Sequence, residues 1–402
     1  MPIDCAFSGC SSLTNVYITD IAAWCKISFH NSYANPSFYA HNLYLNNELV
    51  TELIIPDGVT NIGDYAFSGC SSLTSITIPN SVKRISDSAF ANCTSVTEIL
   101  FNATNCADFA STNNVFASVG AKEVGVSLNI GKNVTRIPAY FAGGYSKSYI
   151  KSILFEDESL CESIGTMAFY NCGITSLTIP ETVTYIGNMA FAYCNDLMEV
   201  NYYAENCVAA EPKALSGDGI FYGSGNNVKL TIGATVKNIE NVFSIYNNYS
   251  QYKLDIESVY YLGTVEQWCQ INFNREPLTK NLHIGGELVE NIVISSAVTK
   301  INDYAFWECT SLKSVVIESG VQEVGYGAFY GCSSLTEVYY NGTQTEWANG
   351  VIGTSNLTIN SDTLYFFSEQ APNLNLDSTA YDGNYWHYVD GIPTIWVYTP
   401  EE

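Results

Sequence analysis

The sequence predicts a strand-rich solenoid of the α/β type: a right-handed array of short coils with a parallel inner sheet. The stretch 71–93, SSLTSITIPNSVKRISDSAFANC, has apolar residues at regular places. It recurs as IPDGVTNIGDYAFSGC, IPETVTYIGNMAFAYC and SGVQEVGYGAFYGC. In the plain copies the repeated Phe returns after 23 residues, as from Phe67 to Phe90 and from Phe306 to Phe329. A period of roughly 20 to 50 residues is typical of solenoids and propellers.

Each part of the repeat has an expected structure. Segment 73–78 alternates apolar and polar residues, which predicts a strand with its apolar side chains inward. Pro79 then turns the chain, and Val82 and Ile85 form a second inward-facing arm. Residues 86–93 are too few for a free-standing helix, so we expect one helical turn. One coil cannot bury its own apolar face, so neighbouring coils must stack with parallel strands about 4.8 Å apart.

Longer steps between copies hold inserted helix-plus-hairpin modules. Three segments begin alike, VYITDIAAW, VYYLGTVEQW and VYYNGTQTEW. Thr264 with Gln267, and Thr343 with Glu346, have the spacing of a capping box, which predicts short helices carrying the module tryptophans. LYLNNELV and LHIGGELV then predict hairpins with two-residue turns.

The ends of the chain differ from the repeat. We assign residues 1–364 to the solenoid and 365–402 to a C-terminal capping tail with a short hairpin around Asp390-Gly391. Trp386 and Trp396 are then available to cover the open end of the core. A separate binding module is the alternative for this tail. The first residues, MPIDCAFSGC, already lie within a repeat, so we expect the N-terminal cap and export signal to be missing from this chain.

Composition restricts the function. The formal net charge of −24 argues against nucleic acid and anionic membranes as partners. No run of about 18 apolar residues is present, so no membrane insertion is expected. Many of the 13 cysteines follow a repeat Phe by three residues, where they are expected to be small buried hydrophobes with free thiols. One disulfide between adjacent coils remains an open alternative.

The pattern LxxIxIPxxVxxIGxxAFxxC resembles the BspA-type leucine-rich repeat over roughly residues 1–340. The resemblance implies a curved solenoid, an extracellular or cell-surface location, and binding of host or bacterial proteins in adhesion. It carries over no catalytic residues. We expect a monomer whose partners are proteins, such as extracellular-matrix or other surface proteins.

Residues suited to catalysis or metal binding are few. The four histidines include no spaced metal pair, and no nucleotide-binding or hydrolase motif is visible. We therefore predict no enzyme and no cofactor. A carbohydrate-cleaving pair among the 40 acidic residues is the least favoured alternative.

Two sets of residues are candidates for binding. Outward strand positions carry acids and the positions just past the strand core carry aromatics, which together predict an acidic and aromatic protein-binding face: Glu52, Glu98, Glu199, Glu337, Tyr202, Tyr260 and Tyr339. A solvated face without a partner is the alternative. A second hypothesis is a spacer or carbohydrate-binding protein that uses the Trp modules and the tail, in which exposed module tryptophans stack on sugars: Trp24, Trp268 and Trp347. Burial of these tryptophans against the hairpins would remove its basis.

Overall fold

A computed structural model describes residues 5–143, 148–209, 219–239, 242–243, 254–273, 278–348 and 352–400. The chain divides into two compact units. The first unit comprises Met1–Val228 and Asn241–Asp255, and the second comprises Lys229–Glu240 and Ile256–Glu402. The boundary expected at residue 364 lies within the second unit and stays a prediction.

The first unit opens with a small sheet and short helices. These are β1 (Asn15–Ile18), α1 (Ile21–Cys25), the 3₁₀-helix η1 (Ser32–Ala34), α2 (Ser37–Ala40), β2 (Asn42–Leu45) and β3 (Glu48–Leu49). β1 pairs in parallel with β2, and β2 pairs antiparallel with β3. The helix and the hairpin expected for this first insertion are therefore both present.

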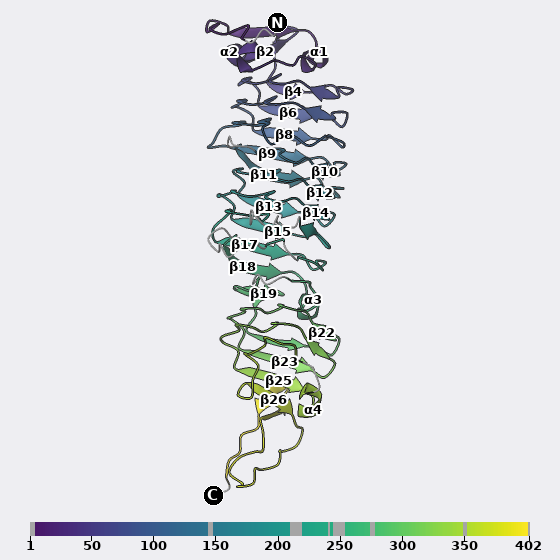
Figure 1. The fold of residues 1–402 in the computed structure, drawn as a ribbon, viewed down its shortest axis with the longest axis vertical. Coiled ribbons are helices and arrows are strands. Elements are labelled where there is room, and N and C mark those ends of the chain that lie inside the picture. The colour runs from purple at the N-terminus through teal and green to yellow at the C-terminus, as the bar shows by residue number, and fades with distance from the viewer. Residues whose placement is uncertain are drawn as a thin grey trace. The chain divides into compact units, whose positions relative to one another are not determined.

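Parallel long strands follow, one for each coil, and Figure 1 shows them stacked one above the next. In order they are β4 (Glu52–Ile54), β6 (Ser75–Ile78), β8 (Glu98–Phe101), β9 (Val126–Ile130), β11 (Ile150–Phe155), β13 (Ser176–Ile179) and β15 (Glu199–Tyr202). Shorter strands lie beside them, to the right in Figure 1: β5 (Asn61–Ile62), β7 (Arg84–Ile85), β10 (Arg136–Ile137), β12 (Ser163–Ile164), β14 (Tyr185–Ile186) and β16 (Val208–Ala209). The short strands form the predicted second arm, as a two-stranded parallel sheet of β5 and β7 and a four-stranded one of β10, β12, β14 and β16.

The second unit is built in the same way. Its elements are β17 (Val228–Ile232), β18 (Ile256–Tyr261), α3 (Val265–Trp268), β19 (Leu282–Ile284), β20 (Glu287–Leu288), β21 (Asn291–Ile294), β22 (Lys300–Ile301), β23 (Ser314–Glu318), β24 (Glu323–Val324), β25 (Glu337–Asn341), α4 (Gln344–Glu346), β26 (Leu364–Phe367), β27 (Tyr385–Val389) and β28 (Ile392–Ile395). β21, β23, β25, β26 and β27 pair in parallel in that order, and β28 closes an antiparallel hairpin with β27. Strand-rich stacking of parallel coils with few helices is thus confirmed.

The core follows the repeat positions. Leu73, Ile76, Ile78, Val82, Ile85, Ala89, Phe90 and Cys93 are all buried. The repeat Phe rings stack along the core, with centroids 5.6 Å apart for Phe67 and Phe90 and 5.3 Å apart for Phe306 and Phe329. Since burying one such ring contributes roughly 1.5 to 3 kcal/mol, this column is a principal source of stability.

The turn that carries each repeat Phe, hereafter the Phe turn, differs from the prediction. Residues 86–93 form hydrogen-bonded turns in place of the expected helical turn, and Ser88 and Asn92 have positive φ values of 52° and 61°. A helical turn would direct successive N–H groups along its own coil. Here the left-handed residues reverse the backbone locally, and alternate N–H groups point toward the next coil.

Hydrogen bonds across these turns join one coil to the next. The N–H groups of Tyr65, Phe67 and Gly69 donate to the carbonyls of Asp87, Ala89 and Ala91 at 2.9, 2.8 and 2.8 Å. In the second unit Tyr304, Phe306 and Glu308 donate to Tyr326, Ala328 and Tyr330 at 3.0, 2.7 and 2.6 Å. The Phe turns therefore form a third hydrogen-bonded side of the solenoid, since their buried N–H groups must find partners.

Candidate functional site

The outward face of the long strands in the first unit is a regular polar surface. Strand pairing aligns one row across the coils: Glu52, Ser75, Glu98, Ser127, Ser152, Ser176 and Glu199. Glu52 and Glu98 are exposed, and Glu199 is half-buried. In the next outward row the Ile54 side chain is 64% exposed and that of Leu154 is 54% exposed. Acids, serines and single apolar residues thus share one open face.

The aromatic part of the predicted face needs correction at Tyr202. This residue is fully buried and packs against Phe243 with ring centroids 5.6 Å apart. The reason is the two-residue period of a strand: Val200 and Tyr202 both point inward, while Glu199 lies on the outward side. Burial raises the pKa of the Tyr202 hydroxyl far above its usual value. Tyr260, by contrast, is half-buried and stacks on His283 with centroids 4.5 Å apart.

Tyr339 needs correction for a different reason. It points outward from β25, but the chain's own tail covers it. Trp386 of β27 is fully buried and packs on Val316 and Tyr339, with Tyr365, Phe367 and Ile395 around them. Half-buried Glu337 accepts a 2.8 Å hydrogen bond from the Tyr339 hydroxyl.

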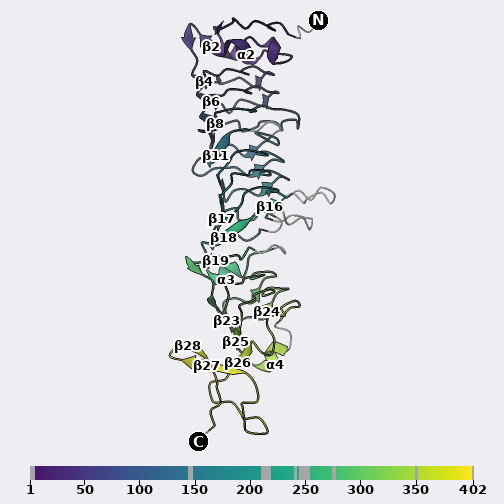
Figure 2. The same ribbon diagram turned by 90° about the vertical axis from the view of Figure 1, so that its left-hand side faces the viewer.

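Polar contacts fix the tail hairpin, which we define as β27 and β28. The indole nitrogen of Trp386 donates to the Tyr340 carbonyl at 3.0 Å, and the Tyr388 hydroxyl donates to a Glu318 carboxylate oxygen at 3.2 Å. Figure 2 shows the hairpin projecting on the side of β23 and β25. The expected strands around Asp390-Gly391 are present, but Trp386 lies on the outward face of the sheet and not over the end of the core.

The tryptophans of the inserted modules are structural. Trp24, Trp268 and Trp347 are all buried, which corrects the expectation that they are exposed. The indole nitrogens of Trp24 and Trp268 donate to the carbonyls of Ala66 and Ala305, both at 2.8 Å. The predicted capping boxes are present at Thr264 and Thr343. With both ring faces enclosed, these residues have no surface on which a sugar could stack, and the carbohydrate hypothesis loses its basis.

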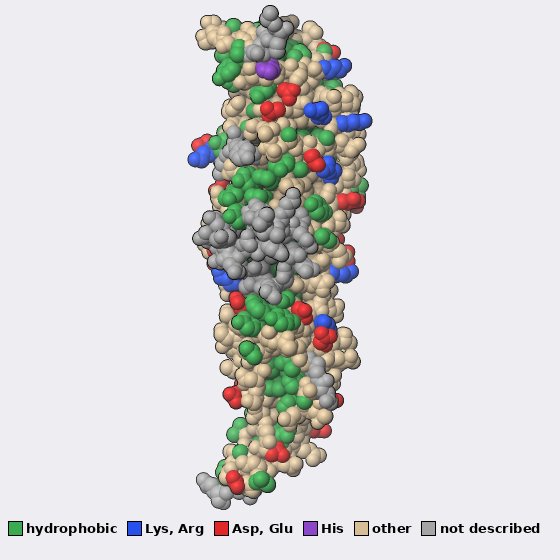
Figure 3. All heavy atoms as spheres, viewed as in Figure 1, with side chains coloured by type: hydrophobic (Ala, Val, Ile, Leu, Met, Phe, Trp, Pro, Cys, Tyr) green, Lys and Arg blue, Asp and Glu red, His purple; other side chains and the backbone are tan. Residues whose placement is uncertain are grey.

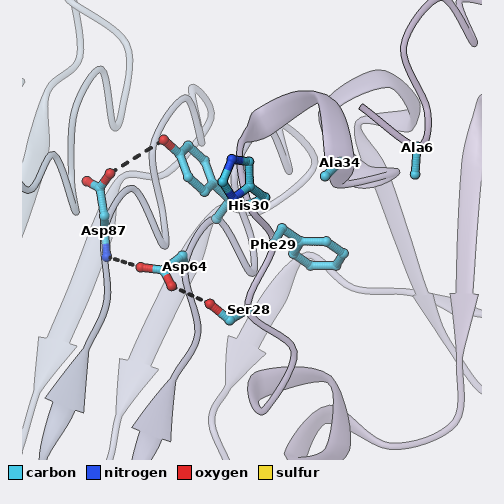
Figure 4. Close-up of a pocket in the computed structure, with 8 residues that line it drawn as sticks. Ala6, Ser28, Phe29, His30, Ala34, Asp64 and Asp87 are labelled. Carbon is cyan, nitrogen blue, oxygen red and sulfur yellow. Dashed lines mark hydrogen bonds between the residues drawn. The ribbon is translucent and has the colours of Figure 1, made fainter. Parts of the chain in front are cut away.

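A cavity of about 650 Å³ lies beside the first Phe turns of the first unit. Figure 4 shows Asp64 between Ser28 and Asp87, with His30 and Phe29 also lining the cavity. The Ser28 hydroxyl donates to one Asp64 oxygen, and the other accepts the Asp87 N–H at 3.0 Å. Carboxylates, a serine and a histidine also occur together in hydrolytic sites. The hydrogen bonds of the two aspartates distinguish a catalytic role from a structural one.

These carboxylates are engaged in joining coils. One Asp87 oxygen accepts from the Asn114 N–H at 2.9 Å and the Ser88 hydroxyl at 3.1 Å. In the second unit the equivalent residue, Asp303, likewise accepts the Tyr326 N–H at 2.8 Å. The aspartates of the cavity therefore have the same structural role as Asp303, which is to accept hydrogen bonds from the next coil. Within the described ranges, no three His, Cys, Asp or Glu residues are grouped so as to hold a metal ion.

The cysteines form no disulfide. All 13 fall among the described residues, and all but Cys5 and Cys10 are buried. Burial raises the pKa values of Cys70 and Cys106 to about 12. Since a thiolate is the nucleophilic form, these side chains act as core residues.

Sequence reasoning missed a group of aromatic side chains on the Phe turns of the second unit. Tyr304, Trp307, Tyr326 and Tyr330 contact one another there, and the Trp307 and Tyr330 rings stack with centroids 4.2 Å apart. Figure 3 shows hydrophobic side chains gathered on this side of the second unit, at the level of β23 and β25. The signal in the sequence is the residue after the repeat Phe, which is aromatic in AFWEC and AFYGC but small in AFSGC and AFANC.

The fold and these surfaces define a repeat protein of stacked parallel coils. The profile described as BspA type leucine rich repeat region (6 copies) matches residues 39–120, 113–241, 162–270 and 284–362. The chain therefore belongs to the BspA-type leucine-rich repeat family, as the resemblance indicated. A comparison with curated proteins found no match.

Three solved structures are similar to this chain. A leucine rich cell surface protein from Faecalibacterium prausnitzii A2-165 is 22% identical, with 84% of this chain and 86% of that chain covered and a TM-score of 0.32. The pneumococcal vaccine antigen PcpA is 18% identical, with 66% and 60% covered and a TM-score of 0.32. A leucine-rich repeat protein from Bacteroides ovatus ATCC 8483 is 19% identical, with 79% and 92% covered and a TM-score of 0.23. Among the described residues of the present chain, none of the helices has the length and apolar character needed to cross a membrane.

Proposed function

We propose that this chain is a non-catalytic, cell-surface protein that binds other extracellular proteins through the outward face of its long strands. The family supports the location, and the similar protein from Faecalibacterium is itself a cell surface protein. In the first unit the face comprises the row from Glu52 to Glu199 and the exposed apolar residues beside it. Its partners are extracellular-matrix or other surface proteins.

The packing of the tail hairpin in the second unit carries the proposal. There the outward face binds a β-hairpin of the same chain through an aromatic anchor, Trp386, on Val316 and Tyr339. Thr77 and Leu100 stand at the corresponding places of their strands, between the same flanking inward residues. A surface that holds an aromatic hairpin in one part of the chain is chemically suited to hold one from a partner in another. Buried aromatic anchors with polar surroundings are typical of protein interfaces.

Charge decides which partners are favoured. Glu52 and Glu199 stand at the two ends of the aligned row and Glu98 lies between them, and one Glu98 oxygen also accepts from Asn129 at 2.6 Å. The face therefore attracts positively charged surfaces and repels acidic ones. Association with the partner should slow as salt concentration rises, because exposed charges are screened within about 8 to 10 Å at physiological ionic strength.

The test uses the full chain and immobilised extracellular-matrix proteins and mucin. Ile54→Arg combined with Leu154→Arg places two cations on the face without touching the core. The control is Val208→Arg, since Val208 is similarly exposed at 59% but lies on the second arm. We expect the double variant to lose binding at least tenfold and the control to bind like the wild type. Equal binding by the double variant and the wild type would refute the proposed face.

A further inference from the structure

The aromatic side chains of the Phe turns in the second unit form a surface separate from the strand face. This aromatic cluster consists of Tyr304, Trp307, Tyr326 and Tyr330. Tyr304 lies 5.3 Å from Trp307 and 5.5 Å from Tyr326 between ring centroids, and Trp307 stacks on Tyr330 at an interplanar angle of 21°. Tyr326 and Tyr330 are each 38% exposed, and the other two are half-buried. Rings from two successive coils thus present faces and edges to solvent together.

The repeat itself does not require these rings. The position of Trp307 and Tyr330, directly after the repeat Phe, is taken by Ser68 and Ala91 in other coils. The position of Tyr304 is taken by Ser88 and, in the very next coil, by Gly327. Tyr304 adopts a φ of 63°, in the region that favours glycine, where a bulky side chain is disfavoured. The coil of Phe90 forms with Ser88 and Ala91 at these positions, so the turn does not require the rings, although Tyr65 and Tyr170 show that aromatic residues also occur there in the first unit.

Acidic side chains border the cluster. Asp303 precedes Tyr304 and Glu308 follows Trp307, and both are exposed. In residues 301–335 the only cation is Lys313, which is ion-paired with Glu290 at 2.9 Å. Lys300 is paired with Glu323 at 2.7 Å. Within residues 301–335 the charge around the rings is therefore negative, in a chain whose formal net charge is −24.

We propose that the aromatic cluster, with Asp303 and Glu308, binds an arginine- or lysine-rich segment of a partner protein. A guanidinium or ammonium group is attracted to the face of Trp or Tyr, and arginine also stacks on such rings. The adjacent carboxylates form charge-assisted hydrogen bonds with the cationic groups of the same ligand. A neutral oligosaccharide would use the rings but would gain nothing from the surplus of negative charge, so the basic segment is the ligand that uses both features.

The test measures binding of a synthetic peptide with alternating arginine and glycine to the full chain, by fluorescence anisotropy. The variant is Trp307→Ala with Tyr330→Ser, since other coils hold Ala and Ser at this position. It keeps every charge of the protein, so any loss reports the rings alone. We expect at least tenfold weaker binding in the variant, and wild-type affinity in Tyr185→Ser, which removes an exposed ring from β14. Glu308→Gln should weaken binding a few-fold and reduce its salt dependence.

Two results would overturn the proposal. One is equal affinity of the wild type and the double variant for the arginine peptide, which would assign the attraction to the net charge alone. The other is that chitohexaose binds at the cluster, with loss in the variant, while the arginine peptide does not bind. Circular dichroism and thermal melting verify that the double variant is folded. If it is not, Tyr304→Gly, which copies the residue of the next coil, gives the same test with the same two outcomes.

Discussion

The indole nitrogen of Trp268 donates a hydrogen bond to the Ala305 carbonyl at 2.8 Å, and Trp24 has the same relationship to Ala66 at 2.8 Å. In both cases the acceptor directly precedes the repeat Phe of the next plain coil. The helix of each inserted module is therefore attached to the following coil at its most buried turn. The same modules also form backbone hydrogen bonds with the following coil. The Cys25 and Cys269 carbonyls accept from the Gly63 and Asn302 N–H groups at 2.8 Å each.

Replacement of Trp268 by Phe should destabilise the protein. The ring is fully buried, and the change leaves the Ala305 carbonyl without its indole donor, at a cost of about 1 to 3 kcal/mol. Urea denaturation measures this loss. The control Tyr17→Phe alters an exposed side chain and should stay within about 0.5 kcal/mol of the wild type. If Trp268→Phe kept full stability and abolished binding of an oligosaccharide, the structural role assigned to this residue would be wrong.

Much of the fold is predictable because the repeat constrains it. Ile76, Val82 and Phe90 recur at fixed spacing, and only a stacked core buries them all. The conformation of the Phe turn is not predictable in this way. Ser88 and Asn92 have no side-chain pattern that separates a helical turn from alternating left-handed residues. The conformation is determined by the hydrogen-bond partners that the N–H groups of the turn find in the next coil. Those partners are present only when the coils are stacked.

The candidate face is predictable only in part, for two physical reasons. The position of Tyr202 past the strand core predicts an outward side chain. The strand, however, keeps its two-residue alternation up to Tyr202, so the ring points inward. Tyr339 does point outward, but Trp386, which is far away in the sequence, covers it. Sequence periodicity does not predict a contact between the tail and a strand that is distant from it in the sequence. The glutamates were easier to place, since exposed charge at an outward position needs no partner.

Removal of the tail anchor should expose the outward face of the sheet at Val316 and Tyr339. Trp386→Ala deletes a fully buried ring and opens Val316 and Tyr339 to solvent, with an expected loss of about 3 to 5 kcal/mol in the stability of the tail hairpin. Hydrogen exchange measured by mass spectrometry should rise in β26, β27 and β28 and remain unchanged in β4 to β13. Val397→Ala, at a 71% exposed residue, serves as the control. Unchanged exchange in β27 would contradict the assigned role of Trp386.

The acids of the Phe turns should contribute to stability and not to catalysis. Asp87→Ala leaves the Asn114 N–H and the hydroxyls of Ser88 and Tyr65 without their acceptor, which should cost about 1 to 3 kcal/mol. Asp87→Asn keeps a carbonyl acceptor and should lose less. Asp57→Ala changes an exposed acid and serves as the control in the same urea titration. Equal stability of all three variants would show that Asp87 is not needed to join the coils.

The buried thiols should make the protein sensitive to alkaline pH. Burial raises the pKa of Cys70 and of Cys106 from 9.0 to about 12, so the folded state keeps both protons where the unfolded state loses them. Their contribution to stability is fully present below about pH 9 and is lost as the pH rises toward about 12, because the unfolded chain binds fewer protons in that range. At pH 10 the loss should be on the order of 1 kcal/mol for each such thiol. Urea denaturation in the presence of a reductant measures this loss of stability. It is carried out at pH 7.5 and pH 10, which lie about one unit or more below and above the unfolded thiol pKa of about 9.

A variant and a labelling experiment separate the thiols from other groups that titrate at high pH. Cys70→Ala should show a smaller difference between the two pH values than the wild type, on the order of 1 kcal/mol, although its stability at neutral pH is lower. In the folded wild type, a thiol reagent should modify Cys5 and Cys10 first, since the other cysteines are buried. Rapid labelling of Cys70 under native conditions, or an unchanged pH difference in Cys70→Ala, would show that this thiol is not enclosed in the core as the stacked coils require.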